Sequence, residues 1–504
     1  MLRIALVSSL IVLVAASPHA RPHRAHPHRH AAAGPATAVT YVAGSTREVC
    51  RLTGEPETAT ATRFGYRDGD LGYSFLYGGR LWFLFGDSFP TATFKGADNK
   101  SNRFPFNTNA ADPNAHDNDA VAYAPRGGPA TQCPPLTFVA QTPAPKGVHP
   151  APAPGAYANP ELVLGGTQIP LGTNQAPVAG FATGSPGHET MYVAFVTNNA
   201  NGRPPPECKS LRQPPGICYG RAYSSVLARL NDRGNPPRSL AFTGVYTLSG
   251  PPQGDGSYAG AFVNVAFADG PGGYVYVWGT YGGGERIVNG HVQCAVGAEC
   301  QMHSYVRLAR IPLARVAAAA SGRSAAIEYY DAANHAQPWQ KDEHAATPLF
   351  RDATPCGSHV GVQWIPALAR WVLLYNCPSA KPSGIVMRSA PQPWGPWSAP
   401  QTIFNPARDH GYCAFMHLDH APASCKPNPG RAGTSGTPYG PYFIAGWTTA
   451  ASHPSGATAV VYYTVSTLNP HGQVILASTL TRGSAGIFRT PPPCRGSMPD
   501  NPCT

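Results

Sequence analysis

Short runs of apolar and aromatic residues, bounded by glycine- and proline-rich segments, recur along the whole chain. Residues 71–77 and 81–85 show the pattern well, because both are dense in the aromatic and aliphatic side chains that short strands favour. Gly78-Gly79 separates them, and a pair of glycines accepts the positive φ angles of a two-residue hairpin turn. Residues 70–87 therefore predict a β-hairpin.

Similar strand pairs recur at residues 176–198, 261–281, 359–376 and 439–449. Each pair is followed by a loop and one or two further strands, and the repeat spacing of roughly 80 to 105 residues exceeds that of compact propeller repeats. Most of the strands are apolar on both faces, which indicates sheets that are covered on both sides. We therefore predict an all-β fold, a five-bladed β-propeller with long loops tied by disulfides. A β-sandwich with an accessory domain is the alternative.

Composition excludes a helical fold, because 54 glycines and 55 prolines place turns throughout the chain. Only residues 313–326 predict even a short helix. The net charge is +11, but residues 1–47 contribute five arginines and no acid, and no basic run follows them. This distribution gives no reason to expect binding to nucleic acid.

The two ends of the chain differ from its middle. Residues 1–17 predict a signal peptide, because Arg3 precedes a short apolar core that ends in small residues. Residues 18–47 predict a disordered leader rich in histidine, proline and alanine, with loose metal chelation as the alternative. We place the propeller at residues 48–490 and a cysteine-containing tail at residues 491–504. The protein is expected to be secreted or periplasmic, with no membrane span after cleavage of the signal peptide.

All twelve cysteines follow the signal peptide, and an even number in an exported chain indicates disulfides. None has the CxxC spacing that is typical of a zinc or redox site. We expect pairing in sequence order, although spacing alone does not fix connectivity. The expected pairs are Cys208–Cys218, Cys294–Cys300, Cys356–Cys377, Cys413–Cys425 and Cys494–Cys503, which leave Cys50 with Cys133.

The hairpin at residues 70–87 carries an aspartate at each end. Counting outward from the turn places Asp70 opposite Asp87, with Cβ atoms about 4.5–5.5 Å apart. Two carboxylates this close do not ionise equally, so one keeps its proton to a higher pH. Glycoside hydrolysis uses such a pair, in which one acid protonates and the other acts as base or nucleophile. The alternative is that both acids merely solvate strand ends.

The HLDH motif at residues 417–420 is a second candidate for chemistry. Its histidines and aspartate are metal-ligand types, but a loop with ordinary polar residues is the better interpretation. Two carboxylates suffice for glycoside hydrolysis, so we expect neither a metal nor an organic cofactor.

Several segments together resemble the exported family known as DUF4185. They are DGDLGYSFLYGGRLWFLFGDSF, VGVQWIPALARWVLLYN, PWGPWSAPQTIF, YGPYFIAGWTT and VVYYTVSTLNPHGQVILAST. The resemblance extends over about residues 60–482 and implies a five-bladed propeller. Some members are endo-D-arabinanases of glycoside hydrolase family 183, whose paired acids stand in a DLG and an FGD motif. Here these motifs contain Asp70 and Asp87.

We therefore predict an exported glycoside hydrolase that acts on a furanose-containing polysaccharide, with D-arabinan as the first candidate. Asp70 and Asp87 are the predicted catalytic pair, at one end of the propeller channel. The predicted sugar contacts are Asn118, Asp119, His359, Tyr439 and Tyr442. We expect a monomer whose partner is the polysaccharide.

His359 departs from the family pattern, which tends to carry a glutamate ahead of this strand. The difference indicates either another preferred sugar or a loss of activity. A non-catalytic carbohydrate-binding or envelope-interaction propeller is the alternative function. A sialidase-like propeller has no support, because no clear SxDxGxxW-type repeat occurs.

Overall fold

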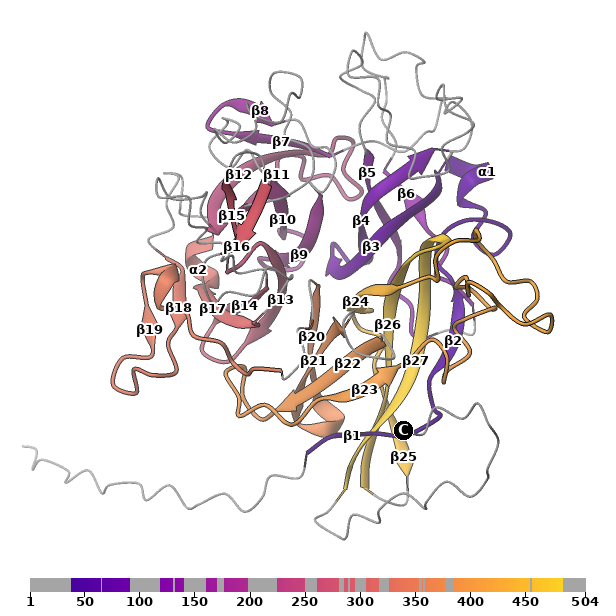
Figure 1. Ribbon diagram of the computed structural model, residues 1–504. Helices are drawn as coiled ribbons and strands as arrows, with labels where there is room; N and C mark the ends of the chain where they lie inside the picture. The colour runs from indigo at the N-terminus through magenta and orange to yellow at the C-terminus, as the bar shows by residue number, and fades with distance from the viewer. Residues whose placement is uncertain are drawn as a thin grey trace, which may run out of the picture. The chain divides into compact units, whose positions relative to one another are not determined.

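The structure, a computed structural model, confirms an all-β fold in which five sheets form the blades of a propeller (Figure 1). It describes residues 38–64, 66–90, 118–129, 132–139, 160–169, 176–197, 224–249, 261–280, 285–288, 291–294, 305–316, 326–352, 356, 359–377, 384–453 and 456–483. Each of the five predicted units lies in one blade, although the two segments of the fifth, at residues 439–449, do not pair with each other. The alternation of short apolar runs with turn residues thus specifies the architecture.

Blade 1 contains the predicted hairpin. Its strands are β3 (Tyr66–Tyr77), β4 (Arg80–Pro90), β5 (Asn118–Pro125) and β6 (Thr137–Phe138). Gly78 and Gly79 have φ angles of 57° and 73°, so the turn is of the type that the two glycines predict. The predicted register holds for the pairs nearest the turn, Tyr77 with Arg80, Phe75 with Trp82 and Tyr73 with Leu84.

Blades 2 and 3 follow along the chain. Blade 2 consists of β9 (Pro177–Thr183), β10 (Thr190–Thr197), β11 (Ser224–Leu230) and β12 (Ala241–Ser249), extended by β7 (Glu161–Leu164) and β8 (Thr167–Ile169). Blade 3 consists of β13 (Asn264–Gly270), β14 (Tyr274–Thr280), β17 (Arg307–Pro312), β18 (Glu328–Tyr330) and β19 (Trp339–Gln340). A separate hairpin, β15 (Glu285–Val288) with β16 (His291–Cys294), lies between β14 and β17 in the sequence.

Blade 4 is a four-stranded sheet of β20 (Val360–Ile365), β21 (Arg370–Cys377), β22 (Gly384–Ala390) and β23 (Gln401–Phe404). Blade 5 contains β24 (Pro438–Phe443), β25 (Thr449–His453), β26 (Gly456–Leu468) and β27 (His471–Gly483). The amino-terminal strands β1 (Thr40–Tyr41) and β2 (Arg47–Arg51) both pair with β27. The first and last strands of the propeller therefore share one sheet, which closes the ring.

The first strand of each predicted unit is the innermost strand of its blade. β3, β9, β13, β20 and β24 contact one another in that order, and β24 returns to contact β3 (Figure 1). Hydrogen bonds cross between blades at this centre: Tyr73 Oη donates to the Phe267 carbonyl at 3.1 Å, and Ser74 Oγ to that of Phe443 at 2.9 Å. The inner strands thus form a closed ring at the centre of the propeller.

Apolar side chains between the blades form the core. Trp82 and Trp278 are completely buried, and burial of a large apolar side chain contributes roughly 1.5–3 kcal/mol. Helices are short: α1 (Thr60–Phe64), α2 (Leu313–Val316) and the 3-10 turns Glu343–Ala345 and Pro366–Leu368. The predicted helix at residues 313–326 is confirmed for its first turn, and residues 317–325 lie outside the described residues. No helix in the described parts is long and apolar enough to cross a membrane.

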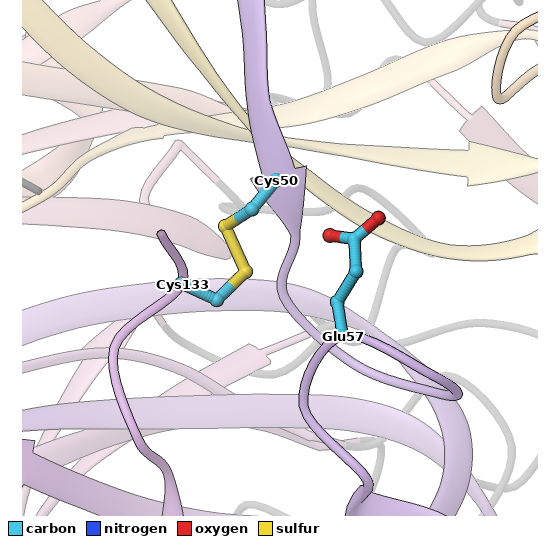
Figure 2. A group of neighbouring side chains, drawn as sticks. All are labelled: Cys50, Glu57 and Cys133. Atoms are coloured by element: carbon cyan, nitrogen blue, oxygen red, sulfur yellow. A yellow bond between two sulfur atoms is a disulfide. The ribbon is translucent and has the colours of Figure 1, made fainter. Parts of the chain in front are cut away.

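Three of the expected disulfides are confirmed, Cys50–Cys133, Cys356–Cys377 and Cys413–Cys425. The first joins the end of β2 in blade 5 to the segment before β6 in blade 1, and Figure 2 shows its sulfur–sulfur bond beside Glu57. The pairs Cys208–Cys218 and Cys494–Cys503 lie outside the described residues, as does Cys300. Disulfides agree with a chain that folds in an oxidising compartment.

Candidate functional site

The two predicted catalytic aspartates are not directly opposed, and that part of the predicted register is wrong. Beyond Tyr73 the pairing shifts, so that Asp70 faces Gly86 rather than Asp87. The cause is a bulge at Leu71 and Gly72, whose φ angles are 65° and 75°. Counting from the turn assumes an unbroken ladder, and the bulge inserts a residue into it.

The carboxyl groups nevertheless lie close together. Oxygens of Asp70 and Asp87 and a ring nitrogen of His471 are all within 4.8 Å of one another. Gly86 allows this approach, because a Cβ atom there would lie 2.8 Å from Asp70 Oδ1. Asp87 itself has a positive φ of 30°, within the irregular stretch of β4 between Phe85 and Ser88. Irregular backbone at residues 71–72 and 86–87 therefore brings the acids together.

Asp70 is buried, with 7% of its surface exposed. Tyr439, on β24, donates a hydrogen bond from its hydroxyl to Asp70 Oδ2 at 2.8 Å. Burial raises the pKa of Asp70 because it disfavours the charged carboxylate. The charge of His471 and the Tyr439 hydrogen bond oppose this shift, whereas the charge of Asp68 adds to it. Asp70 thus keeps its proton to a higher pH than an exposed aspartate does.

Three of the predicted sugar-contact residues form an aromatic wall beside Asp70. The ring of His359, just before β20, lies 5.8 Å from that of Tyr439 and 6.3 Å from that of Tyr442. Burial raises the pKa of both tyrosines well above the usual range, and Asp70 adds to the shift. Burial lowers the pKa of His359 to about 4, so its ring is neutral at pH 7. The wall is therefore uncharged.

Tyrosine rings from neighbouring blades also pack beside the site. The ring of Tyr442 packs edge to face against that of Tyr73, with ring centroids 5.2 Å apart. The Tyr73 hydroxyl donates a hydrogen bond to the carbonyl oxygen of Phe267 on β13. The Tyr73 hydroxyl also accepts a hydrogen bond from the Phe267 backbone N–H at 3.0 Å. These contacts join blades 1, 3 and 5 next to Asp70. An apolar boundary of this kind explains the desolvation that raises the pKa of the acid.

Asn118 and Asp119, the remaining predicted contacts, begin β5 next to the acid-bearing strand. Asn118 pairs with Ser88, and Asp119 follows it opposite the irregular stretch of β4 that contains Asp87. Asp119 is 2% exposed. The fold therefore places both residues next to Asp87 along the sheet, and Asp119 faces the protein rather than solvent.

Sequence reasoning missed Asp68 and His471. His471 opens β27, and its Nδ1 lies 3.1 Å from Asp68 Oδ1. Arg67 Nε lies 2.7 Å from the other oxygen of Asp68. The histidine and this aspartate are 403 positions apart in the chain, so no local pattern joins them. Closure of the ring by blade 5 brings them into contact.

The HLDH motif has ordinary loop contacts. His417 Nδ1 lies 3.0 Å from the Pro429 carbonyl oxygen, and Asp419 Oδ1 accepts a hydrogen bond from the Gly433 N–H at 2.9 Å. His420 is exposed and lies beside Asp419. These partners agree with the interpretation of the motif as a polar loop.

Within the described ranges, two groups of side chains bring metal-ligand atoms together. The first is Cys50, Glu57 and Cys133, but its sulfurs are bonded to each other (Figure 2) and a disulfide sulfur is a poor ligand. The second is Asp70, Asp87 and His471. Its spacing also suits a small cation, for which mass spectrometry of the wild type and of His471→Asn is the test.

Comparison with known proteins confirms the predicted family resemblance for the second half of the propeller. Residues 242–477 match the family described as "Domain of unknown function (DUF4185)". The match begins in β12 and ends in β27, so it includes Tyr439, Tyr442, His359 and His471. Asp70 and Asp87 precede the matched range. No curated protein matches the chain.

Distant likenesses to solved structures were also found. An α-L-arabinofuranosidase from Podospora anserina is 10% identical with a TM-score of 0.36, over 87% of this chain and 98% of that one. An exo-β-1,3-galactanase from Phanerochaete chrysosporium is 10% identical with a TM-score of 0.36, over 86% and 64%. An endo-1,5-α-L-arabinanase from Thermotoga petrophila is 8% identical with a TM-score of 0.35, over 82% and 71%. TM-scores this low establish neither a common fold nor an activity.

Proposed function

We propose that the protein is an exported glycoside hydrolase that cuts a furanose-containing polysaccharide. The observation that carries this proposal is the pair of carboxyl groups of Asp70 and Asp87, whose oxygens lie within 4.8 Å of each other beside an aromatic wall. One acid is buried with a raised pKa and the other is half-buried. Two carboxyl groups in different environments are what acid-assisted glycoside cleavage requires.

Asp70 is assigned as the general acid, because burial favours its protonated form. Its proton passes to the glycosidic oxygen as the bond from that oxygen to the anomeric carbon breaks. Asp87 is assigned as the nucleophile, whose carboxylate oxygen bonds to the same carbon and forms a glycosyl ester. Asp70, now ionised, then takes a proton from water, which attacks the anomeric carbon and releases Asp87.

The short separation of the acids favours retention of anomeric configuration. Retaining enzymes hold their carboxyl groups about 5–5.5 Å apart, whereas inverting enzymes need about 6.5–9.5 Å to seat a water molecule. The limit of 4.8 Å between oxygens agrees with the first geometry. The half-buried ring of His359 is the proposed sugar contact of the wall, whereas the buried rings of Tyr439 and Tyr442 support it and Asp70 from behind. Asn118 and Asp119 begin the neighbouring strand of blade 1, and the buried Asp119 supports this side of the proposed subsite without contacting solvent.

D-Arabinan is the first candidate substrate, through the DUF4185 resemblance alone. His359, at the position where that family tends to carry glutamate, supplies a neutral ring instead of a charge. We therefore expect the preferred sugar to differ from that of relatives with the glutamate, and other furanose polymers belong in the same test. The expected product is a set of shorter saccharides released outside the cell.

The test is a release assay on arabinans, other furanose polymers and pyranose polymers, with ¹H NMR of the first anomer formed. Wild type should release saccharides from a furanose polymer, with retained configuration. Asp70→Asn and Asp87→Asn should each lower turnover by roughly 10²–10⁴-fold or more while the circular dichroism spectrum stays unchanged. If wild type binds a polymer but cuts none, the alternative of a non-catalytic carbohydrate-binding propeller is correct.

A further inference from the structure

Asp68 and His471 stand beside the acid pair but take no part in the proton transfers proposed above. Asp68 is held on both sides, by Arg67 Nε at 2.7 Å and by His471 Nδ1 at 3.1 Å. A carboxylate on one ring nitrogen fixes the orientation of a histidine. The imidazole is therefore held in one place, with a ring nitrogen within 4.8 Å of oxygens of both Asp70 and Asp87.

The groups that face the acids from the surrounding strands show what His471 contributes. On β3 and β4 they are Asp68 and Asp87 themselves, and β5 adds Asp119 beside Asp87. On β24 they are the phenols Tyr439 and Tyr442, and His359 packs behind them as a neutral ring. Arg67 is engaged by Asp68. Among these described neighbours, His471 is thus the basic side chain within reach of both carboxyl groups, and its charge lowers the pKa of Asp70.

Without a positive charge nearby, two neighbouring acids beside buried phenols would both tend to stay protonated. The nucleophile needs a carboxylate, while the general acid needs its proton, so the site must stabilise a single negative charge. A positive ring close to both carboxyl groups stabilises that singly charged state. It also opposes the rise in the pKa of Asp70 that burial causes.

We propose that His471, oriented by Asp68, is a positioning residue that keeps one carboxyl of the Asp70–Asp87 pair ionised while the other keeps its proton. The catalytic role of His471 rests on the proposed hydrolase function. The charge coupling between His471 and the two acids does not, and it can be measured without any substrate.

The first experiment is ¹³C NMR of the full-length protein with labelled aspartate side chains, assigned with Asp70→Asn and Asp87→Asn. Titration of wild type is compared with His471→Asn, which removes the cation but keeps a polar side chain of similar reach. His471→Lys restores a positive charge. His335→Asn, in an exposed loop of blade 3, is the matched control.

The expected result is a higher pKa of Asp70 in His471→Asn than in wild type, with a value nearer wild type in His471→Lys. His335→Asn should leave the titration unchanged. With a substrate from the release assay, both limbs of the pH profile of kcat/KM should move to higher pH in His471→Asn, and kcat at pH 5 should fall by at least tenfold.

Two outcomes overturn the proposal. The first is an unchanged Asp70 titration in a folded His471→Asn variant. The second is a stoichiometric metal ion, found by mass spectrometry of wild type and lost in His471→Asn, because the imidazole would then be a metal ligand. A changed titration in a protein that cuts no glycan supports the charge coupling and disproves only the hydrolase function, so the two failures are distinguishable.

Discussion

At the scale of single residues, the site contains carboxyl groups whose burial destabilises the folded state. Asp70 is buried against Tyr439, and its carboxyl lies close to those of Asp87 and Asp68. Burial of a carboxyl without a full countercharge opposes folding whenever the group is ionised. Burial thus lowers stability and lets Asp70 keep its proton to a higher pH, and pKa shifts of this kind are common at functional sites.

Asp70→Asn should therefore stabilise the protein at pH 7. The folded pKa of Asp70 is raised above its unfolded value of about 3.8, so the native state binds its proton more tightly. The resulting advantage is complete below the unfolded pKa and is lost as the pH rises through the folded pKa. Above the folded pKa the wild type carries the full penalty of a buried carboxylate, and the amide carries none.

Urea unfolding of both proteins between pH 4 and pH 8 checks this expectation. The difference in unfolding free energy should be largest at neutral pH and should shrink toward pH 4. Glu161→Gln, at an exposed position of β7, is a control that should show no such trend. A stability difference that is independent of pH would contradict the role of burial.

Gly86 is a second residue on which the site depends. A Cβ atom there would lie 2.8 Å from Asp70 Oδ1, 2.9 Å from Leu71 Cδ1 and 3.1 Å from Ala176 Cβ. Gly86→Ala should displace the Asp70 carboxyl, and displacement of a catalytic group by about 1 Å costs on the order of 10²-fold in rate. Kinetics on the substrate from the release assay measure the effect.

Gly128→Ala is the matched control for this change, because nothing lies within 4 Å of a Cβ atom at Gly128. It should keep wild-type activity and stability. Wild-type turnover in Gly86→Ala would show that the close approach of Asp70 to this strand is not needed for catalysis.

At the scale of elements, the disulfides differ in what they join. Cys50–Cys133 connects β2 of blade 5 with the outer part of blade 1 and spans 83 positions, whereas Cys413–Cys425 lies within one loop and spans 12. The long-range bridge thus secures the junction at which the ring closes. A bridge that closes a longer loop restricts the unfolded chain more.

Loss of Cys50–Cys133 should therefore lower the free energy of unfolding more than loss of Cys413–Cys425 does. Loop-closure entropy predicts a difference of about 1.7 kcal/mol in unfolding free energy. Denaturant unfolding of the two double Cys→Ser variants measures it. Equal losses would indicate that strain or residual structure, rather than loop length, controls the contribution of each bridge.

At the scale of the whole molecule, the propeller closes because an amino-terminal strand pairs with the last strand of the final blade. Thr40 pairs with Thr481 and Tyr41 with Leu480, so the amino-terminal strand β1 completes the last blade. Tyr41 and Leu480 are buried in the same apolar cluster of blades 4 and 5. Closure of this kind protects the edge of β27 and couples the first blade to the last.

A chain that begins at Gly44 lacks β1 and should unfold at a lower temperature, by a few degrees, because β27 loses its edge partner and Leu480 becomes exposed. A chain that begins at Thr37, before β1, should match the full-length protein. Differential scanning calorimetry of the three proteins distinguishes these outcomes. An unchanged midpoint without β1 would mean that β2 and the disulfide close the ring unaided.

The sequence by itself determined the features that depend on neighbouring residues. Gly78 and Gly79 fixed the first hairpin, and the apolar strand pairs fixed five blades, since turn type and side-chain alternation are local properties. Short cysteine spacings likewise indicated Cys356–Cys377 and Cys413–Cys425. For the site, the sequence identified the two acids and the later wall residues His359, Tyr439 and Tyr442. It did not determine how the two acids approach each other.

Only the tertiary structure decided how the acids meet and what surrounds them. The bulge at Gly72 changed the partner of Asp70 to Gly86, because the packing of Thr464 and β24 against β3 shapes that stretch. His471 reaches Asp68 from 403 positions away because the ring closes. A contact between distant segments depends on the sum of packing over all blades, and no pattern within either segment contains that information.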